Sequence, residues 1–201
     1  GIDDQRINLT VRGMAQTEIG YLMDGIPAAD PSNYKLYTTQ NVDNENLARV
    51  YLTQGSASPT SPLYNAVGGE LTQTLRTPSD HAGGYADFSG GSYSLDREFF
   101  RIDTGEIGHT GIRSYASFSH THAEDWRGPG YTTRYHMDNK TVKEWGHSGA
   151  ELLVSYNTTT SFYPRFPTLT QWKQYGTNFN WEKDYIPGSA NYYRFQQNVR
   201  N

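Results

Sequence analysis

The chain has 201 residues, a net charge of −4 and no cysteine, which excludes a disulfide framework and a thiol nucleophile. It lacks the basic footprint of a nucleic-acid-binding protein, and no apolar run approaches the roughly 18 residues of a membrane helix. Sixteen Tyr, eight Phe and twenty Gly favour a β-rich chain. Composition alone fits a soluble β-sandwich or lectin-like domain, but a membrane β-barrel gives an equally weak hydropathy signal.

The first eighty residues alternate between short predicted elements and tight turns. Apolar residues at every second position predict strands over residues 5–12, 49–54 and 67–76. A short apolar run at Tyr21–Met23 is closed by the turn pair Asp24-Gly25, and residues 44–48 fit a helical turn. Together these elements predict a compact α+β unit.

Longer strands are predicted from about residue 82, over residues 85–89, 100–103, 111–121, 134–143 and 151–157. Tight turns are expected at Leu95-Asp96, 107–110 and 145–148, and a longer loop at 124–133. No return to a strand is predicted in the Tyr-, Trp- and Pro-rich segment after Ser161. Short turns at one end of a sheet and long loops at the other are typical of outer-membrane barrels, of which the smallest has about eight strands. Five strands predict an incomplete barrel.

Several motifs of the first eighty residues occur in a known order. They are Val11–Met14 (VRGM), Met23–Pro27 (MDGIP), Arg49–Ser58 (RVYLTQGSAS), Tyr64–Gly69 (YNAVGG) and Thr74–Pro78 (TLRTP). In order and approximate spacing they resemble the plug domain of TonB-dependent outer-membrane receptors and its exit into the barrel. Gln54 stands where this family usually has a basic residue, and Ser56 where it often has Pro. These departures leave the subfamily open.

The resemblance implies an α+β plug at residues 1–80, lacking its first part, followed by antiparallel transmembrane β-barrel strands at residues 81–201, truncated at the C-terminus. It implies a non-enzymatic receptor in the bacterial outer membrane that imports a scarce nutrient, most commonly a ferric siderophore, using energy passed through TonB. The implied partners are TonB, outer-membrane lipid and the nutrient, with no cofactor and no nucleic acid. Two alternatives stay open: a glycan or vitamin as the nutrient, and a soluble carbohydrate-binding β module.

Family analogy also suggests ligand contacts in two loops. Asp30, Tyr34 and Tyr37 follow the Asp-Gly-Ile-Pro turn, and tyrosine rings can stack on a siderophore or hydrogen-bond it. Trp126 and Arg127 lie in the predicted long loop, where an arginine suits an anionic ferric complex. The alternative is that the tyrosines pack against the barrel wall and that Trp126 and Arg127 face the membrane interface.

Other motif residues are assigned structural roles in the plug: Arg12, Gly13, Asp24, Gly25, Gly55, Gly68 and Gly69. No G-x-S-x-G, H-E-x-x-H or P-loop motif occurs. His120 and His122 are two residues apart on one face of a predicted strand, which would supply half of a metal site. The remaining histidines have no ligand spacing, so no metal site is predicted.

Overall fold

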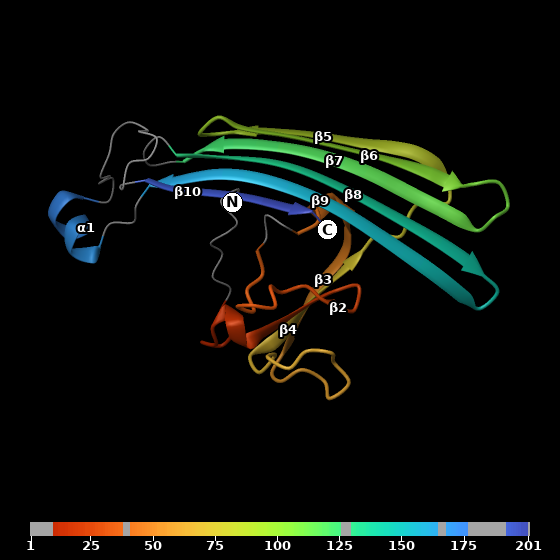
Figure 1. Cartoon of the computed structure of the whole chain (residues 1–201), viewed down its shortest axis with the longest axis horizontal. Coiled ribbons are helices and arrows are strands. Elements are labelled where there is room, and N and C mark those ends of the chain that lie inside the picture. The colour runs from red at the N-terminus through yellow and green to blue at the C-terminus, as the bar shows by residue number, and fades with distance from the viewer. Residues whose placement is uncertain (1–9, 38–40, 126–129, 165–167, 177–191, 201) are drawn as a thin grey trace. The chain divides into compact units, whose positions relative to one another are not determined.

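The computed structural model describes residues 10–37, 41–125, 130–164, 168–176 and 192–200 (Figure 1). The chain divides into two compact units, residues 3–78 and residues 79–201. Among the described strands, each unit has a separate β-sheet. The assignment of these units as plug and barrel stays a prediction.

The first unit contains a four-stranded sheet in the order β2-β1-β4-β3. Its strands are β1 (Ile19–Met23), β2 (Ile26–Pro27), β3 (Leu47–Gln54) and β4 (Gly69–Leu75). β1 runs parallel to β4, and the other two pairs are antiparallel. The predicted helical turn is confirmed as a 3₁₀ turn at Asn44–Asn46, and a second 3₁₀ turn covers Gln16–Glu18. The strand predicted over residues 5–12 lies mostly outside the described residues, and its last residue, Arg12, belongs to a turn instead.

Two tight turns of the first unit share one backbone conformation. Arg12 and Gly13 have φ values of 51° and 81°, and Asp24 and Gly25 have values of 46° and 79°. Two consecutive residues with positive φ form the turn type that matches the twist of β-hairpins, and glycine adopts this conformation with little strain. The Asp24-Gly25 turn joins β1 to β2, and the Asp24 carboxylate accepts a hydrogen bond from the Leu75 amide at 2.8 Å.

The apolar core of the first unit is small. Val11, Ile19 and Tyr21 are buried together, with Ala28, Ala29, Leu36 and Leu71 packed against them. Burial raises the pKa of Tyr21 to about 12, and its hydroxyl donates to the Gln16 carbonyl at 3.3 Å. At Gly20 the loop at residues 55–68 comes so close to β1 that there is no room for a side chain: an added Cβ would lie 2.4 Å from Leu63 Cδ1 and 2.6 Å from Ala66 Cβ.

The second unit contains one antiparallel sheet of six strands in chain order (Figure 1). They are β5 (Ala82–Gly91), β6 (Leu95–Glu106), β7 (Ile112–Glu124), β8 (Tyr131–Trp145), β9 (Ser148–Pro164) and β10 (Tyr192–Arg200). All five strands predicted after residue 82 are confirmed, with longer bounds. β5 and β10 each have one partner among the described strands, so these strands form an open sheet.

Three sequence predictions about the second unit are wrong. The first tight turn lies at residues 92–94, not at Leu95-Asp96, which belong to β6. Tyr93 and Ser94 make this turn with φ values of 59° and 53°, although neither is a residue type that signals such a turn. The segment after Ser161 does return to a strand, since β10 pairs with β9. The expected separation of loop lengths is incomplete, because the short 92–94 turn shares an end of the sheet with the 125–130 and 165–191 connections.

The helix α1 (Leu169–Tyr175) was not expected from the sequence. It begins with a reciprocal cap, in which Thr168 Oγ1 accepts from the Gln171 amide and the Gln171 side chain accepts from the Thr168 amide. In the part of the chain that the structure describes, no helix has the length and apolar character needed to cross a membrane.

The two faces of the second sheet differ sharply in polarity. One face buries mainly polar side chains, whereas the opposite face exposes apolar ones, as alternation along a strand requires. The buried polar set is Arg101, Ser117, Ser119, Thr121, Thr132, His136, Asp138, Lys140, Asn157, Thr159 and Ser161. The exposed apolar set includes Phe88, Phe100, Ile102, Met137, Leu152, Val154 and Tyr156. This distribution is the inverse of a water-soluble sheet with one covered face.

The close packing at Gly20 yields a stability prediction. We expect Gly20→Ala to lower the free energy of unfolding of the first unit by about 1–3 kcal/mol, because the new methyl group would clash with Leu63 and Ala66. The urea concentration at which this unit becomes protease-sensitive should fall by roughly 1 M. Gly83→Ala is the control, since nothing lies within 4 Å of a Cβ added there. Equal midpoints for Gly20→Ala and the unmodified chain would contradict the prediction.

Candidate functional site

Asp30 organises a loop of the first unit that follows β2. Its Oδ1 accepts hydrogen bonds from the Ser32 amide at 2.7 Å and the Ser32 hydroxyl at 2.6 Å, and its carbonyl accepts from the Tyr34 amide at 2.8 Å. The Ser32 hydrogen bonds hold the pKa of Asp30 below its ordinary value. Asp30 therefore shapes the loop with its side chain and backbone together.

This loop brings Tyr34 against Tyr64, thirty positions later in the chain. Their rings meet edge to face with centroids 5.4 Å apart, and the hydrogen bond that the Tyr64 hydroxyl makes to Tyr34 raises the pKa of Tyr64. Tyr64 is 78% exposed. Tyr34 has a φ of 57°, a left-handed conformation that costs a non-glycine residue about 1–2 kcal/mol. The pair forms an exposed aromatic surface at the junction of two loops, which we call the tyrosine pair.

The other predicted contact residues are not all brought to this surface. The Tyr37 hydroxyl accepts a hydrogen bond from Asn33 Nδ2 at 3.0 Å, so Tyr37 closes the same loop from its far end. Trp126 and Arg127 lie outside the described residues. Tyr64 was not predicted as a contact residue and was noted only as part of the Tyr64–Gly69 motif. A second tyrosine in a long loop of the same unit was the sequence feature that could have indicated it.

The residues given structural roles occupy constrained positions in the first unit. Arg12 Nη2 donates to Gln54 Oε1 at 2.6 Å, so the neutral glutamine at the family's usual basic position is a partner of this arginine. Gly55 has a φ of 93° immediately after β3. A Cβ on Gly68 would lie 2.7 Å from Met14 Cβ, and one on Gly69 would lie 2.7 Å from the Thr53 carbonyl oxygen. Of the residues given structural roles, only Arg12 and Asp24 have side chains, and the Asp24 carboxylate already accepts a hydrogen bond from the Leu75 amide.

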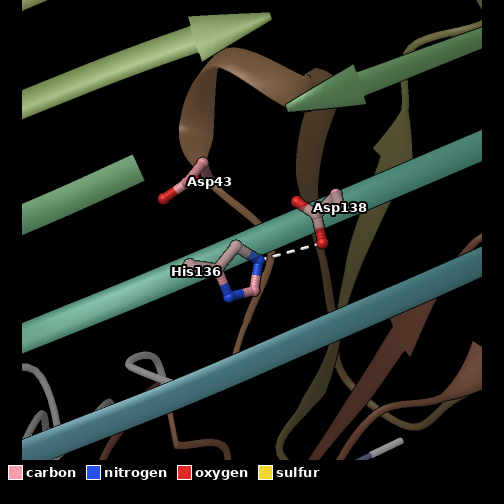
Figure 2. A group of neighbouring side chains, drawn as sticks. All are labelled: Asp43, His136 and Asp138. Atoms are coloured by element: carbon pink, nitrogen blue, oxygen red, sulfur yellow. Dashed lines mark hydrogen bonds and ion pairs between the residues drawn. The ribbon is translucent and has the colours of Figure 1, made fainter. Parts of the chain in front are cut away.

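The buried face of the second sheet carries a connected polar network, which we call the β8–β9 network. The His136 ring faces the Asp138 carboxylate on β8 at 2.9 Å (Figure 2). Its other nitrogen lies 3.1 Å from Asn157 Oδ1, which also accepts from Arg134 Nε at 2.9 Å. Asp43, also drawn in Figure 2, belongs to the first unit. Buried polar groups need such partners, since each unpaired one costs free energy.

The β8–β9 network contains a serine, a histidine and an aspartate, but not in a catalytic order. Ser155 Oγ donates to Asp138 Oδ1 at 2.7 Å. In a nucleophilic triad the hydroxyl donates to the histidine, which is oriented by the acid. Here Ser155 and His136 both contact the same oxygen of Asp138. This arrangement fixes the positions of the polar side chains on this face and does not activate a nucleophile. Two further ion pairs on this face, Arg101–Asp103 and Lys140–Glu151, are 3.1 Å each.

A shallow hollow of about 270 Å³ lies near the short turns of the second sheet. Arg113, on β7, pairs there with Asp80 and with Glu144, the latter at 2.6 Å. Glu106 lines the same hollow and accepts a hydrogen bond from the Gly111 amide at 3.2 Å. Arg113 therefore links the residues just before β5 to the end of β8 through two ion pairs. We interpret the hollow as a structural ion-pair site and not as a ligand site.

The Asp30 loop yields a pH prediction. A carboxyl whose pKa is lowered stabilises its surroundings above the ordinary value of 3.8 and loses this effect as the pH falls through the lowered pKa. We expect the Ser32 amide to stay protected from hydrogen exchange at neutral pH and to lose protection only below pH 3.8. Asp30→Asn keeps an acceptor oxygen but not the titration, so it should abolish this pH dependence. An unchanged acid transition in Asp30→Asn would assign it to another group.

No protein-family model matches this sequence, and no curated protein matches it significantly. Solved structures do match. The ferripyoverdine receptor of the outer membrane of Pseudomonas aeruginosa is 14% identical with a TM-score of 0.60, over 80% of this chain and 22% of the receptor. The siderophore receptor PiuA from Acinetobacter baumannii is 16% identical with a TM-score of 0.56, over 79% and 22%.

The ferric citrate transporter FecA, in its unliganded form, is 19% identical with a TM-score of 0.66, over 87% of this chain and 28% of the transporter. The chain thus spans about a quarter of the length of these receptors. At such identities the likeness concerns the fold. The resemblance drawn from the sequence motifs is confirmed at that level: this chain has the fold of one part of the TonB-dependent siderophore receptors of the outer membrane.

Proposed function

We propose that the protein is an outer-membrane receptor, energised through TonB, that imports a ferric siderophore. The inverted sheet of the second unit carries this proposal. Phe100, Ile102 and Leu152 are exposed on one face, while Arg101, His136 and Lys140 are buried on the other. Exposing these apolar side chains to water would be unfavourable. A barrel wall that faces lipid, in contrast, requires apolar residues on the outside and polar residues on the inside.

Strand length and backbone pairing support the same conclusion. The strands β5 to β9 have 10 to 17 residues each, and a tilted strand needs about 9–11 residues to cross a membrane. Antiparallel pairing satisfies the backbone groups of the inner strands, as a hydrocarbon surrounding demands. An open edge cannot persist in lipid, so closure requires strands beyond the described ones.

The ligand is inferred from the structural neighbours and the tyrosine pair. The solved receptors with this fold are described as receptors of ferripyoverdine, siderophores or ferric citrate. We infer that Asp30 and Tyr37 shape a loop that presents Tyr34, and that Tyr34 and Tyr64 contact the ferric complex. The left-handed backbone of Tyr34 costs conformational free energy, and such strain is common at binding sites. It therefore supports a role for Tyr34 in ligand contact. Trp126 and Arg127 stay proposed contacts.

Transport by this scheme needs no covalent chemistry. Binding energy selects the ferric complex at the loops, and work delivered through TonB changes the plug so that the complex passes. The polar face formed by the β8–β9 network would keep the inner wall wetted and charge-balanced. A glycan or vitamin is the second candidate cargo, because exposed tyrosine rings stack on sugars as readily as on aromatic chelators.

Fractionation and uptake test the proposed function. We expect the full-length protein, produced in a Gram-negative host lacking its own ferric-siderophore receptors, to enter the outer membrane. It should support uptake of radioactive iron from ferripyoverdine or ferric citrate only when TonB is present. Recovery in the soluble fraction would exclude the receptor and favour the carbohydrate-binding module. Outer-membrane insertion without iron uptake or induction by iron starvation would favour the glycan or vitamin.

The tyrosine pair gives a more local prediction. We expect Tyr34→Ala and Tyr64→Ala each to weaken binding of the ferric complex roughly fivefold with normal membrane insertion, because each removes an aromatic contact worth about 1 kcal/mol. Tyr34→Phe keeps the ring and should retain most of the affinity. Tyr51→Ala, an exposed tyrosine of β3 outside both loops, is the matched control. Unchanged affinity in Tyr34→Ala, measured by fluorescence titration, would return Tyr34 to a structural role.

A further inference from the structure

The register between β6 and β7 gathers metal-binding side chains that are far apart in sequence. Glu98 pairs with His120 across the two strands, and Asp96, on the same face of β6, lies one pleat further along. One ligand atom from each of these three residues lies within 4.8 Å of the other two. The sequence spacing groups His120 with His122, and the sheet adds two carboxylates by placing Glu98 opposite His120 and Asp96 opposite His122. The Nδ1 of His122 is already hydrogen-bonded to Thr133 Oγ1 at 2.8 Å.

The contacts within this group leave its charges uncompensated. His120 Nδ1 lies 3.5 Å from Glu98 Oε2, longer than a good hydrogen bond. The Asp96 carboxylate makes no hydrogen bond or ion pair with any residue that the structure describes. Two carboxylates on one face of a strand repel each other, and one imidazole cannot neutralise both. A bound cation would remove this repulsion.

The imidazole is held in place by a contact outside the group. The His120 ring stacks on Tyr135 of β8 with centroids 4.6 Å apart and an interplanar angle of 28°. This stacking fixes the ring plane while a nitrogen faces Glu98. On the other flank Asp96 pairs with Gly90 of β5, which has no side chain to fill the space beside the carboxylate. The donors are thus oriented and accessible.

We propose that Asp96, Glu98 and His120 form a binding site for a divalent first-row transition metal ion, with Zn²⁺ as the reference ion. Mixed nitrogen and oxygen donors favour such ions over Mg²⁺, which prefers oxygen ligands alone. Three protein ligands leave at least one coordination position to water or to an anionic group from outside. The site lies on the face of the sheet that the proposed function turns toward lipid, at the end of β6 next to the 92–94 turn, so it is separate from the Tyr34 loop and from the buried face.

The site is tested by titrating the tag-free full chain in detergent with Zn²⁺ and measuring the heat of binding by isothermal titration calorimetry. We expect one bound ion per chain and at least a tenfold weaker affinity in His120→Ala, Asp96→Asn and Glu98→Gln. His109→Ala is the control, because this exposed histidine lies between β6 and β7 at the opposite end of these strands from Asp96 and His120. It should bind Zn²⁺ within twofold of the unmodified chain. Circular dichroism confirms that each variant retains its sheet.

Several outcomes would overturn the site. These are no Zn²⁺ binding by the unmodified chain, unchanged binding in His120→Ala and Asp96→Asn, or an equal loss in His109→Ala. Mg²⁺ binding as tight as that of Zn²⁺ and insensitive to His120→Ala would also reject the role of the imidazole. The titration is independent of iron uptake, so failure of the metal site and failure of the transport proposal are distinguished.

Discussion

Two-residue alternation along antiparallel strands is the constraint on which the second unit depends. Once the ladder from β5 to β9 is formed, every side chain is committed to one face, and a shift by one residue would exchange the faces. The register puts Arg101 and His136 on the buried side and Phe100 and Met137 on the exposed side. The buried side is tolerable because its charges and amides are paired with one another, and the exposed side requires an apolar surrounding.

The first unit depends on close backbone approach more than on a large core. Among its described residues the buried apolar cluster is small. The 55–68 loop packs closely against β1 because Gly20 has no side chain, and single hydrogen bonds such as Asn65 Nδ2 to the Thr17 carbonyl at 3.1 Å add to this contact. Such a unit can be rearranged at modest cost, since little buried apolar area must be exposed. That property suits a plug in the proposed mechanism.

Local signals explain which elements were predictable. The Asp24-Gly25 turn and the strands with regular alternation follow from residue type alone. The turn at Tyr93-Ser94 did not, because neither residue type signals positive φ and the sheet imposes the conformation. Strand β10 was missed because its pairing with β9 spans a long connection, and a non-local partner leaves no trace in the local pattern.

The sequence by itself determined the β-rich class, the short elements before residue 80, the long strands after it and the motifs that resemble the receptor plug, because these depend on neighbouring residues. Tertiary structure alone decided the meeting of Tyr34 with Tyr64 and of His120 with Glu98 and Asp96. Each of these contacts joins separate segments through loop packing or strand register. Such geometry is set by long-range pairing, which residue order does not specify.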